Sequence, residues 1–272
     1  MPEVALPDVT IAYDVFGPET GDPVVLVCGL SQPAVAWQFT LVPALTGAGY
    51  RVVSFDNRGV APSSSPPAPY TVDQMVGDTI GLLDHLGLGL VRIVGYSMGG
   101  WVAETMAFRH AERVKAGVFI GSCNAGTSWE KVVTTVERDL ARIDAELPPW
   151  FNAVETLRYL PNHELQTDSV VDEWMALLGG LEPWENPGRL GQYEAALAWS
   201  LDVERTKRWP TLRPPCLVLS FEHDVDSPPA RARQAAAMIP GARFVELAGA
   251  SHLGVFSHAE AVASEILSFF AE

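Results

Sequence analysis

The chain has 272 residues, of which 48% are hydrophobic and 19% are charged. This length allows one large α/β unit or a core with an insertion, and the composition excludes a disordered, collagenous or coiled-coil chain. Acidic side chains outnumber basic ones by 33 to 18, and the formal charge of -15 argues against nucleic acid and anionic membranes as partners.

The predicted elements begin with residues 7–17, where apolar residues alternate with polar or small ones as in an antiparallel strand with one exposed face. Further on, short apolar runs bounded by Gly, Pro or Asp predict buried strands at residues 24–28, 52–55, 91–94, 118–120, 216–219 and 244–247. Helical patterns occupy residues 75–86 (opened by a capping box at 71–74), 98–109, 230–238 and 260–270. This alternation predicts an α/β fold with a mostly parallel, doubly wound sheet.

The interval between the fourth and fifth parallel strands is too long for a crossover helix. It contains its own amphipathic segments, so we expect residues 125–208 to form an inserted helical cap on a core of residues 1–124 and 209–272. The insertion is rich in aromatic residues, which either pack its interior or contact a substrate: Trp129, Trp150, Phe151, Tyr159, Trp174, Trp184, Tyr193 and Trp199.

A Gly-Tyr-Ser-Met-Gly-Gly sequence at residues 95–100 joins a predicted strand to a predicted helix. It matches the G-x-S-x-G nucleophile elbow in the context that the motif requires. Gly95 and Gly99 lack the bulk that would prevent the sharp turn from closing, and the turn lifts the Ser97 hydroxyl clear of the sheet. The Met98 amide then lies at a helix N-terminus, where it can donate to a developing oxyanion.

A serine nucleophile needs a base and a carboxylate that orients the base. His252 follows the last predicted strand in a loop of small residues, whereas His85, His110, His163 and His258 lie in or beside helical patterns or the cap. Asp224 follows the preceding strand and is the preferred acid, with Asp226 as its rival. Glu222 and His223 are interpreted as solvated loop residues.

The order Ser97, Asp224, His252, together with the elbow and the insertion, resembles the α/β-hydrolase fold family of esterases, lipases and C–C hydrolases. The similarity also covers residues 11–17, 27–30 and 56–59. It implies that the Leu30 amide is the second oxyanion donor. Cys28 stands where the family commonly has His, and Ala61 replaces a family glycine, so we expect an altered oxyanion loop with intact catalysis.

Candidate substrate contacts surround these positions. Around the oxyanion loop and the elbow we expect contacts from Gly29, Ser31, Trp37 and Tyr96, and from the cap we expect Trp129 and Trp150. Gln32 and Trp101 are further candidates by position, although core packing is the alternative for Trp37 and Trp101.

The function hypothesis is a serine hydrolase that cleaves an ester or thioester of a small to medium apolar acyl substrate. A second hypothesis is an acyltransferase or thioesterase served by an acyl carrier protein, which Arg205, Lys207 and Arg208 clustered beside the pocket would favour. A C–C hydrolase, a perhydrolase and a receptor-like protein would use the same three residues. Family dehalogenases and epoxide hydrolases carry an elbow aspartate, so Ser97 argues against both.

The sequence indicates neither a cofactor nor a metal, because phosphate-loop, dinucleotide and metal-ligand motifs are missing. Cys28, Cys123 and Cys216 are too far apart to predict a disulfide framework. A basic and apolar leader at the start is missing, as is any run of about 18 apolar residues. We therefore expect a cytoplasmic protein without a membrane span.

Overall fold

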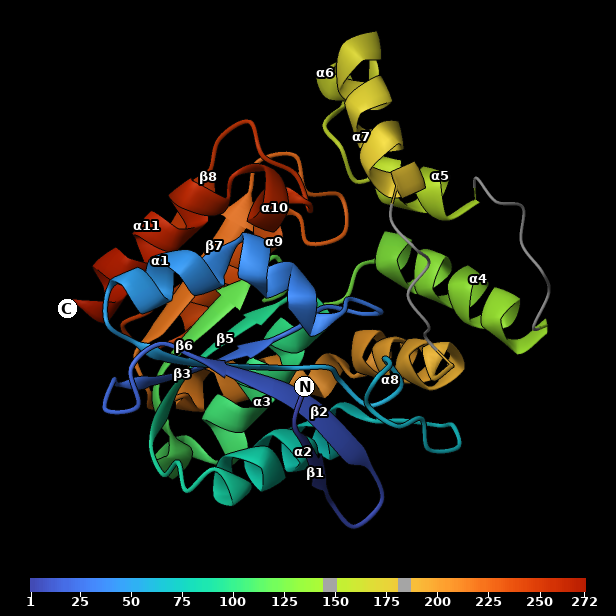
Figure 1. Cartoon of the computed structure of the whole chain (residues 1–272). Coiled ribbons are helices and arrows are strands. Elements are labelled where there is room, and N and C mark those ends of the chain that lie inside the picture. The colour runs from blue at the N-terminus through green and yellow to red at the C-terminus, as the bar shows by residue number, and fades with distance from the viewer. Residues whose placement is uncertain (144–150, 181–186) are drawn as a thin grey trace.

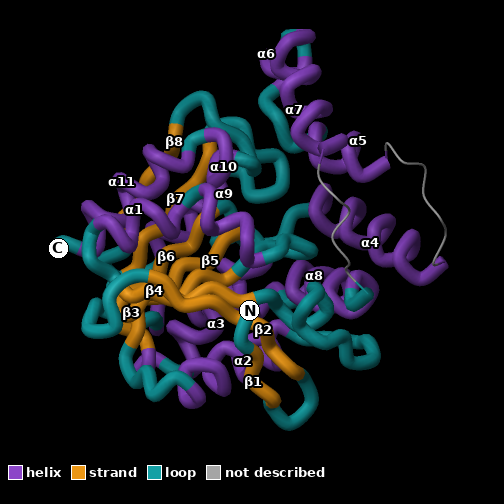
Figure 2. The backbone as a smooth tube through the Cα atoms, in the orientation of Figure 1, coloured by secondary structure: helices purple, strands orange, loops and turns teal. Residues whose placement is uncertain are grey.

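A computed structural model describes residues 1–143, 151–180 and 187–272. Within these ranges the strands form one eight-stranded sheet in the order β1-β2-β4-β3-β5-β6-β7-β8 (Figures 1 and 2). The strands are β1 (Glu3–Ala5), β2 (Thr10–Phe16), β3 (Pro23–Val27), β4 (Arg51–Phe55), β5 (Val91–Tyr96), β6 (Val114–Ile120), β7 (Cys216–Phe221) and β8 (Arg243–Leu247). The pairs β1–β2 and β2–β4 are antiparallel and all others are parallel, which confirms the predicted fold class.

The edge of the sheet differs from the sequence expectation of one strand over residues 7–17. The chain turns there, with the Leu6 N–H donating to the Val9 carbonyl at 2.8 Å, and β1 pairs with β2 as a hairpin. Pro7 lies inside this turn and has no N–H to give to a ladder, so the expected strand begins only at Thr10, and β1 is a further short strand that the sequence pattern did not predict.

Helices cover both faces of the sheet. One apolar core lies under α2 (Val72–His85), α3 (Met98–Arg109) and α9 (Pro229–Met238), and the other lies under α1 (Leu41–Gly47) and α11 (Ala259–Phe270). Short helical turns complete the connections: η1 (Ala34–Phe39), η2 (Ala111–Arg113) and α10 (Gly254–Ser257). The predicted capping box opens α2, with Thr71 and Gln74 each accepting a hydrogen bond from the other's backbone N–H.

The register brings the carboxyl ends of the strands together at one edge of the sheet. Gly95 of β5 pairs with Val27 of β3 on one side and with Phe119 of β6 on the other. Strands β6, β7 and β8 continue in parallel, so the loops after β7 and β8 emerge at the same edge as the turn after β5. Ligand sites in open α/β sheets form at such an edge.

The chain between β6 and β7 is helical in the part that the structure describes. It contains α4 (Ser128–Ile143), α5 (Phe151–Leu157), α6 (Asn162–Leu165), α7 (Asp168–Gly180), α8 (Arg189–Leu201) and η3 (Val203–Thr211). Helix α4 packs along α8, which also contacts α2, while α5 to α7 stand further from the sheet (Figure 1). We refer to residues 125–208 as the helical segment. Trp150 and Trp184 of this segment lie outside the described residues.

Candidate active site

Ser97 occupies a strained turn between β5 and α3. Its backbone has φ 53° and ψ -122°, a region that non-glycine residues rarely adopt, and its N–H donates to the Ile120 carbonyl at 2.9 Å. A Cβ atom on Gly95 would lie 2.1 Å from the Gly99 carbonyl oxygen, and one on Gly99 would lie 2.1 Å from the Val27 carbonyl oxygen. Both glycines are therefore required for the turn to close against the backbone of the sheet.

Three side chains form a hydrogen-bonded series at this turn. The Nδ1 atom of His252 lies 2.8 Å from Oδ2 of Asp224, and its Nε2 atom lies 3.0 Å from Oγ of Ser97. Because an ionised carboxylate only accepts hydrogen bonds, Nδ1 carries the proton and Nε2 is left to accept from the serine hydroxyl. This is the arrangement that a serine nucleophile and its base require.

The surroundings of His252 favour its charged form once it takes up a proton. Burial of the imidazole lowers its pKa, but the charge and hydrogen bond of Asp224, together with the charge of Asp226, outweigh burial and raise the pKa above its usual value. The cation of Arg158 acts in the opposite direction. An imidazolium that forms during a reaction would thus be stabilised by the carboxylates of one loop.

Burial and hydrogen bonding distinguish Asp224 from Asp226. Asp224 is buried, and its Oδ1 accepts the N–H groups of Asp226 and Ser227 at 2.9 and 2.7 Å. The loop after β7 thereby fixes the carboxylate that contacts His252. Asp226 instead lines a cavity, and the other histidines of the chain are exposed or half-exposed on other surfaces.

The loop after β3 lies against the serine. A Cβ atom on Gly29 would be 3.3 Å from the Ser97 Cβ, so this loop and the elbow are in contact. The Met98 amide is the first N–H of α3, a position where the helix itself provides no acceptor. The loop amide of Leu30 follows directly after Gly29. These two amides are the ones that sequence analysis assigns to an oxyanion.

Polar side chains of the loop itself and of the loop after β4 hold the loop after β3 in place. The Gly29 N–H donates to Gln32 Oε1 at 2.9 Å, and Asn57 Nδ2 donates to the Cys28 carbonyl at 3.0 Å. Asp56 accepts from the Ala34 N–H at 2.6 Å. Burial raises the pKa of Asp56 to about 6, although this hydrogen bond lowers it. The loop is thus supported with Cys28 in the position where the family commonly has His.

The predicted substrate contacts occupy different environments. Trp37 is fully buried in the core beneath α1, which favours the packing alternative. Tyr96 is buried beside the base, where its hydroxyl donates to the His252 carbonyl at 2.9 Å. Trp129 is 53% exposed on α4 and lines two cavities, and the N–H of Ser31 points to the helical segment. Trp150 lies outside the described residues.

Gln192 of α8 is a contact that sequence analysis missed. It is fully buried, its Oε1 accepts the Ser31 N–H at 2.8 Å, and its Nε2 donates to the Arg58 carbonyl at 2.9 Å. A glutamine in a helix carries no sequence signal of its own. Gly188 and Gly191 do carry a signal, because no side chain fits at either position. A Cβ atom on Gly188 would lie 2.2 Å from the Cα atom of Gly59, and one on Gly191 would lie 2.6 Å from the ring of Tyr70.

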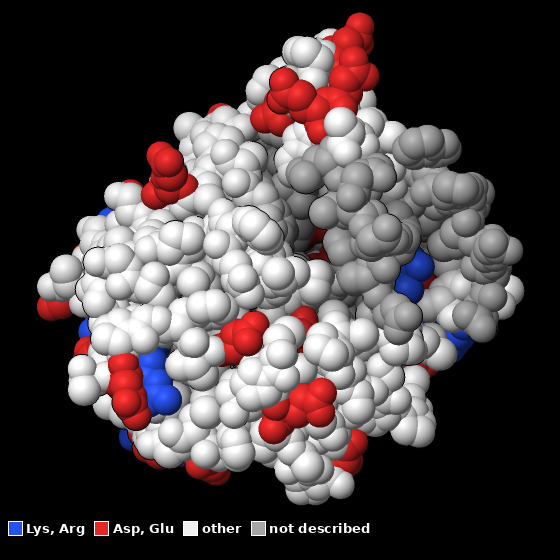
Figure 3. Space-filling view, viewed as in Figure 1, with Lys and Arg blue, Asp and Glu red and all other residues white. Residues whose placement is uncertain are grey.

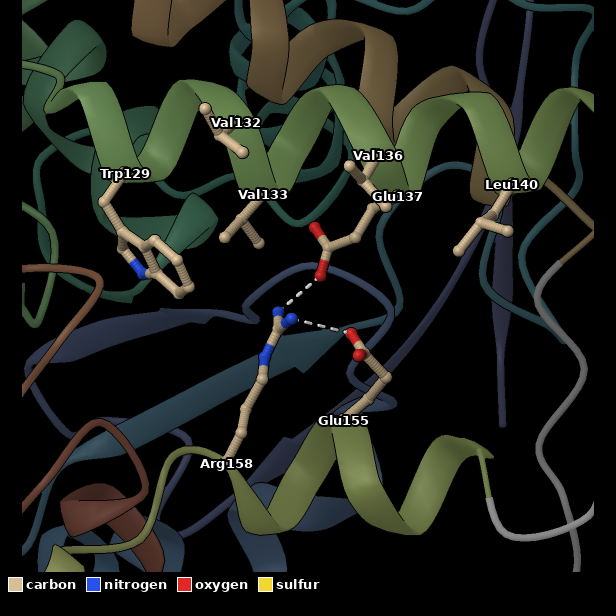
Figure 4. A pocket seen from close by; sticks show the side chains of 8 residues that line it. All are labelled: Trp129, Val132, Val133, Val136, Glu137, Leu140, Glu155 and Arg158. Carbon is tan, nitrogen blue, oxygen red and sulfur yellow. Dashed lines mark hydrogen bonds and ion pairs between the residues drawn. The ribbon is translucent and has the colours of Figure 1, made fainter.

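Two cavities share part of their lining: one lies between the helical segment and the loop after β7, and the other lies within the helical segment. The first has a volume of about 390 Å³ and is lined by Trp129, Arg158, Val225 and Asp226. The second, of about 260 Å³, runs along α4 and shares Trp129 and Arg158 with the first (Figure 4). Apolar side chains of α4 form one wall of the second cavity, and the ion-paired Arg158 of the turn after α5 lies opposite.

Neither a membrane-spanning helix nor a metal-ligand cluster occurs in the described ranges. No helix there is both long and apolar enough to cross a membrane. In residues 1–143, 151–180 and 187–272, no three or more His, Cys, Asp or Glu side chains are gathered as a metal site would need. The three cysteines are buried and unpaired with one another.

The sheet order, the elbow and the serine-centred site define an α/β hydrolase. The chain matches the model of the alpha/beta hydrolase family over residues 24–265 and belongs to this family. Its relatives include proteins named as hydrolases, which supports an enzyme.

Among these relatives is the "Putative non-heme bromoperoxidase BpoC" of Mycobacterium tuberculosis. It is 32% identical over 267 residues, covering 97% of this chain and 98% of the relative, and its crystal structure aligns with a TM-score of 0.85. The enol-lactonase of Burkholderia xenovorans LB400 aligns over 100% of both chains with 27% identity and a TM-score of 0.83. Epoxide hydrolase B of M. tuberculosis is 38% identical over 110 residues, which cover 40% of this chain and 31% of that protein.

Proposed function

We propose that the protein is a serine hydrolase that cleaves a carboxylic ester or thioester through an acyl-enzyme. The observation that carries this proposal is the hydrogen-bonded series of Ser97, His252 and Asp224 at the strained turn after β5. The enol-lactonase relative, whose name describes the opening of a cyclic ester, agrees with ester chemistry.

The mechanism follows from these contacts. His252 Nε2 takes the proton of Ser97 as its oxygen attacks the acyl carbonyl carbon, and Asp224 stabilises the imidazolium that forms. The Met98 and Leu30 amides donate to the tetrahedral oxyanion, and loss of one such donor costs about 3 kcal/mol of transition-state stabilisation. His252 then protonates the leaving alcohol or thiol. Water, deprotonated by the same imidazole, attacks the acyl carbon and releases the acid and Ser97.

The proposed substrate is apolar and small to medium in size. The cavity beside the loop after β7 is walled by Trp129 and Val225, and the cavity within the helical segment is walled by apolar side chains of α4, where Arg158 is paired with Glu137 and Glu155. We further propose that residues 125–208 act as a cap that encloses the substrate on the core of residues 1–124 and 209–272. The location that we propose is the cytoplasm, and the reaction needs no cofactor.

The nature of the nucleophile argues against epoxide chemistry. Family members that open epoxides attack with an elbow aspartate, whereas this chain has Ser97 at that position. Epoxide hydrolase B matches 40% of this chain, but the elbow residue of this chain is Ser97 and not an aspartate.

A perhydrolase is a second candidate, favoured by the name of the BpoC relative. Hydrogen peroxide would replace water in attacking the acyl carbon, so that the released product is a peracid instead of an acid. The same three residues would serve, and a peracid would in turn oxidise bromide.

The carrier-protein alternative lacks the basic patch that would favour it. Arg205 is 1% exposed, Lys207 is paired with Glu204, and Arg208 is paired with Asp202. The face in Figure 3 carries more acidic than basic side chains, so it would repel an acidic carrier.

The test is labelling with a fluorophosphonate, followed by peptide mass spectrometry. We expect one phosphonyl group on Ser97 and hydrolysis of p-nitrophenyl esters by the same preparation. Ser97→Ala should lose both, and Ser257→Ala, which removes an exposed hydroxyl, should keep both. Label elsewhere, or tight ligand binding with negligible turnover, would contradict the proposal, and the second result would indicate a receptor-like protein.

A further inference from the structure

A tyrosine of the helical segment contacts the imidazole of His252. Tyr159 lies in the turn after α5, and its ring centroid is 5.2 Å from that of the imidazole with an interplanar angle of 39°. Tyr96 of the core lies at the same centroid distance, with an angle of 38°, and also binds the His252 carbonyl through its hydroxyl. The sheet side thus holds the backbone of the base and one tyrosine ring, while the helical segment supplies a second ring.

Arg158 fixes the position of Tyr159. Its Nη2 donates to the tyrosine hydroxyl at 2.7 Å, and its guanidinium carbon lies 4.8 Å from the centroid of the same ring. The guanidinium is itself held by Glu137 of α4 at 2.5 Å and by Glu155 of α5 at 3.0 Å (Figure 4). A planar guanidinium bound on two sides keeps a defined direction. A continuous set of contacts therefore runs from α4 to the imidazole.

This set of contacts is polar where simple packing would need only apolar side chains. Burial raises the pKa of Glu137 to about 7, even though the charge and hydrogen bond of Arg158 lower it, so this carboxyl gives up its proton less readily than an exposed glutamic acid. Partly buried ion pairs such as these are weak sources of stability, because desolvation offsets much of their attraction. Their benefit lies in fixing one geometry, and the geometry fixed here is that of a ring lying against His252.

We propose that Tyr159 is a positioning residue for His252, held in place by Arg158 and its two carboxylate partners. This inference rests on the proposed function, in which His252 is the base. The imidazole must keep Nδ1 on Asp224 and Nε2 on Ser97, and a tyrosine ring against it resists rotation away from these partners. Because Tyr159 belongs to the helical segment, the base is fully aligned only when this segment is seated on the core.

The charged groups around His252 allow its contact with Tyr159 to be tested through the pH dependence of activity. The groups that face it are Asp224 and Asp226 of the loop after β7, Ser97 and Tyr96 of the elbow, and Arg158 and Tyr159 of the helical segment. Removing the Tyr159 ring opens the imidazole to water, and removing Arg158 takes away a nearby cation. Burial and Arg158 both lower the pKa of His252, so both changes raise that pKa. Since a general base must be unprotonated, the acid limb of the pH profile should move to higher pH.

The experiment compares Tyr159→Leu, Tyr159→Phe and Arg158→Met with the full-length wild type, by kcat and KM for a p-nitrophenyl ester across the pH range. Tyr159→Leu should lower kcat about 10-fold to 100-fold with little change in KM and should move the acid limb upward, because small misplacements of catalytic groups have effects of this size. Tyr159→Phe keeps the ring and should stay within about 3-fold of wild type. Tyr193→Leu is the matched control, since Arg189 stacks on the Tyr193 ring at 5.4 Å on α8 and no ring contact joins Tyr193 to His252 in the described residues.

Two outcomes would overturn the inference. One is a Tyr159→Leu enzyme with the wild-type kcat and acid limb. The other applies if that variant fails to fold: Arg158→Met, which keeps Tyr159 but removes the group that holds its hydroxyl, would then have to shift the acid limb upward, and an unchanged limb would end the proposal. Fluorophosphonate labelling of each variant separates this failure from that of the proposed function, because an unlabelled Ser97 in the wild type would contradict the latter.

Discussion

The sheet and the helical segment hold the same site by different means. On the sheet side, Ser97 is placed by the backbone: Gly95 and Gly99 pass within van der Waals distance of neighbouring main-chain atoms, so even a methyl group cannot be added. On the helical side, Gln192 and Tyr159 reach the site through the ends of long side chains. Backbone contacts allow almost no substitution, whereas side-chain contacts can be replaced one at a time.

The sheet and the helical segment also differ in how far their apolar side chains are exposed. The valines of β3 are fully buried, while on α4 Trp129 and Val136 are each 53% exposed beside the cavities. Burial fixes a core, and exposed apolar side chains beside a cavity are available to a ligand. We therefore propose that the sheet side carries the chemistry and that the helical segment selects the substrate.

The largest expected effect concerns the acid on the sheet side. Asp224→Asn should lower kcat about 10⁴-fold, because an amide at this position favours the wrong imidazole tautomer. Asp226→Asn should change kcat less than about 10-fold, since the Asp226 side chain does not bond the imidazole. Steady-state kinetics at saturating ester checks both, and similar losses in the two variants would remove the distinction between these carboxylates.

A smaller effect is expected when the backbone contact at the elbow is broken. Gly95→Ala places a Cβ atom 2.1 Å from the Gly99 carbonyl oxygen and should cost about 3 kcal/mol of unfolding free energy. Gly77→Ala is the matched control, because a Cβ atom at this exposed position of α2 meets nothing within 4 Å, and it should gain about 0.5 to 1 kcal/mol. Urea unfolding measures both, and an equally stable Gly95→Ala would contradict the backbone argument.

The junction between the two regions should be sensitive to Gln192. Gln192→Leu leaves the Ser31 N–H and the Arg58 carbonyl without their present partner, which should cost about 2 kcal/mol. The same substitution at Gln234, exposed on α9, should stay within about 0.5 kcal/mol. If both variants unfold at the same urea concentration, the hydrogen bonds of Gln192 do not stabilise the junction between the sheet and the helical segment.

A pH dependence of local stability is expected in the helical segment. Glu137 has a folded-state pKa raised from 4.5 to about 7, so the folded state binds the extra proton and stability falls as pH rises between these values. Glu137→Gln should remove this fall, and Asp139→Asn, on the exposed side of α4, should keep it. Hydrogen exchange of α4 amides at about pH 5 and pH 8 tests the sign. A Glu137→Gln variant with the wild-type slope would show that another group titrates.

The residues near Ser97 were predictable because their signals are local. A glycine two positions on either side of a serine, between an apolar run and a helical pattern, describes one turn of backbone. His252 and Asp224 could be chosen because each follows an apolar run that ends at the same sheet edge. The later start of β2 at Thr10 and its pairing with the unpredicted strand β1 depended on Pro7 and a single turn, which the alternating pattern does not reveal.

The parallel strands, the elbow and the two side chains that join Ser97 could be predicted from the sequence, because hydrophobic period and turn chemistry depend on neighbouring residues. The structure was needed to show that Trp37 is buried in the core, that Gln192 holds the loop after β3, and that Arg158 directs Tyr159 onto His252. These contacts join residues far apart in the chain through the ends of long side chains. Their positions depend on how helices pack, and the residue types involved are compatible with many packings.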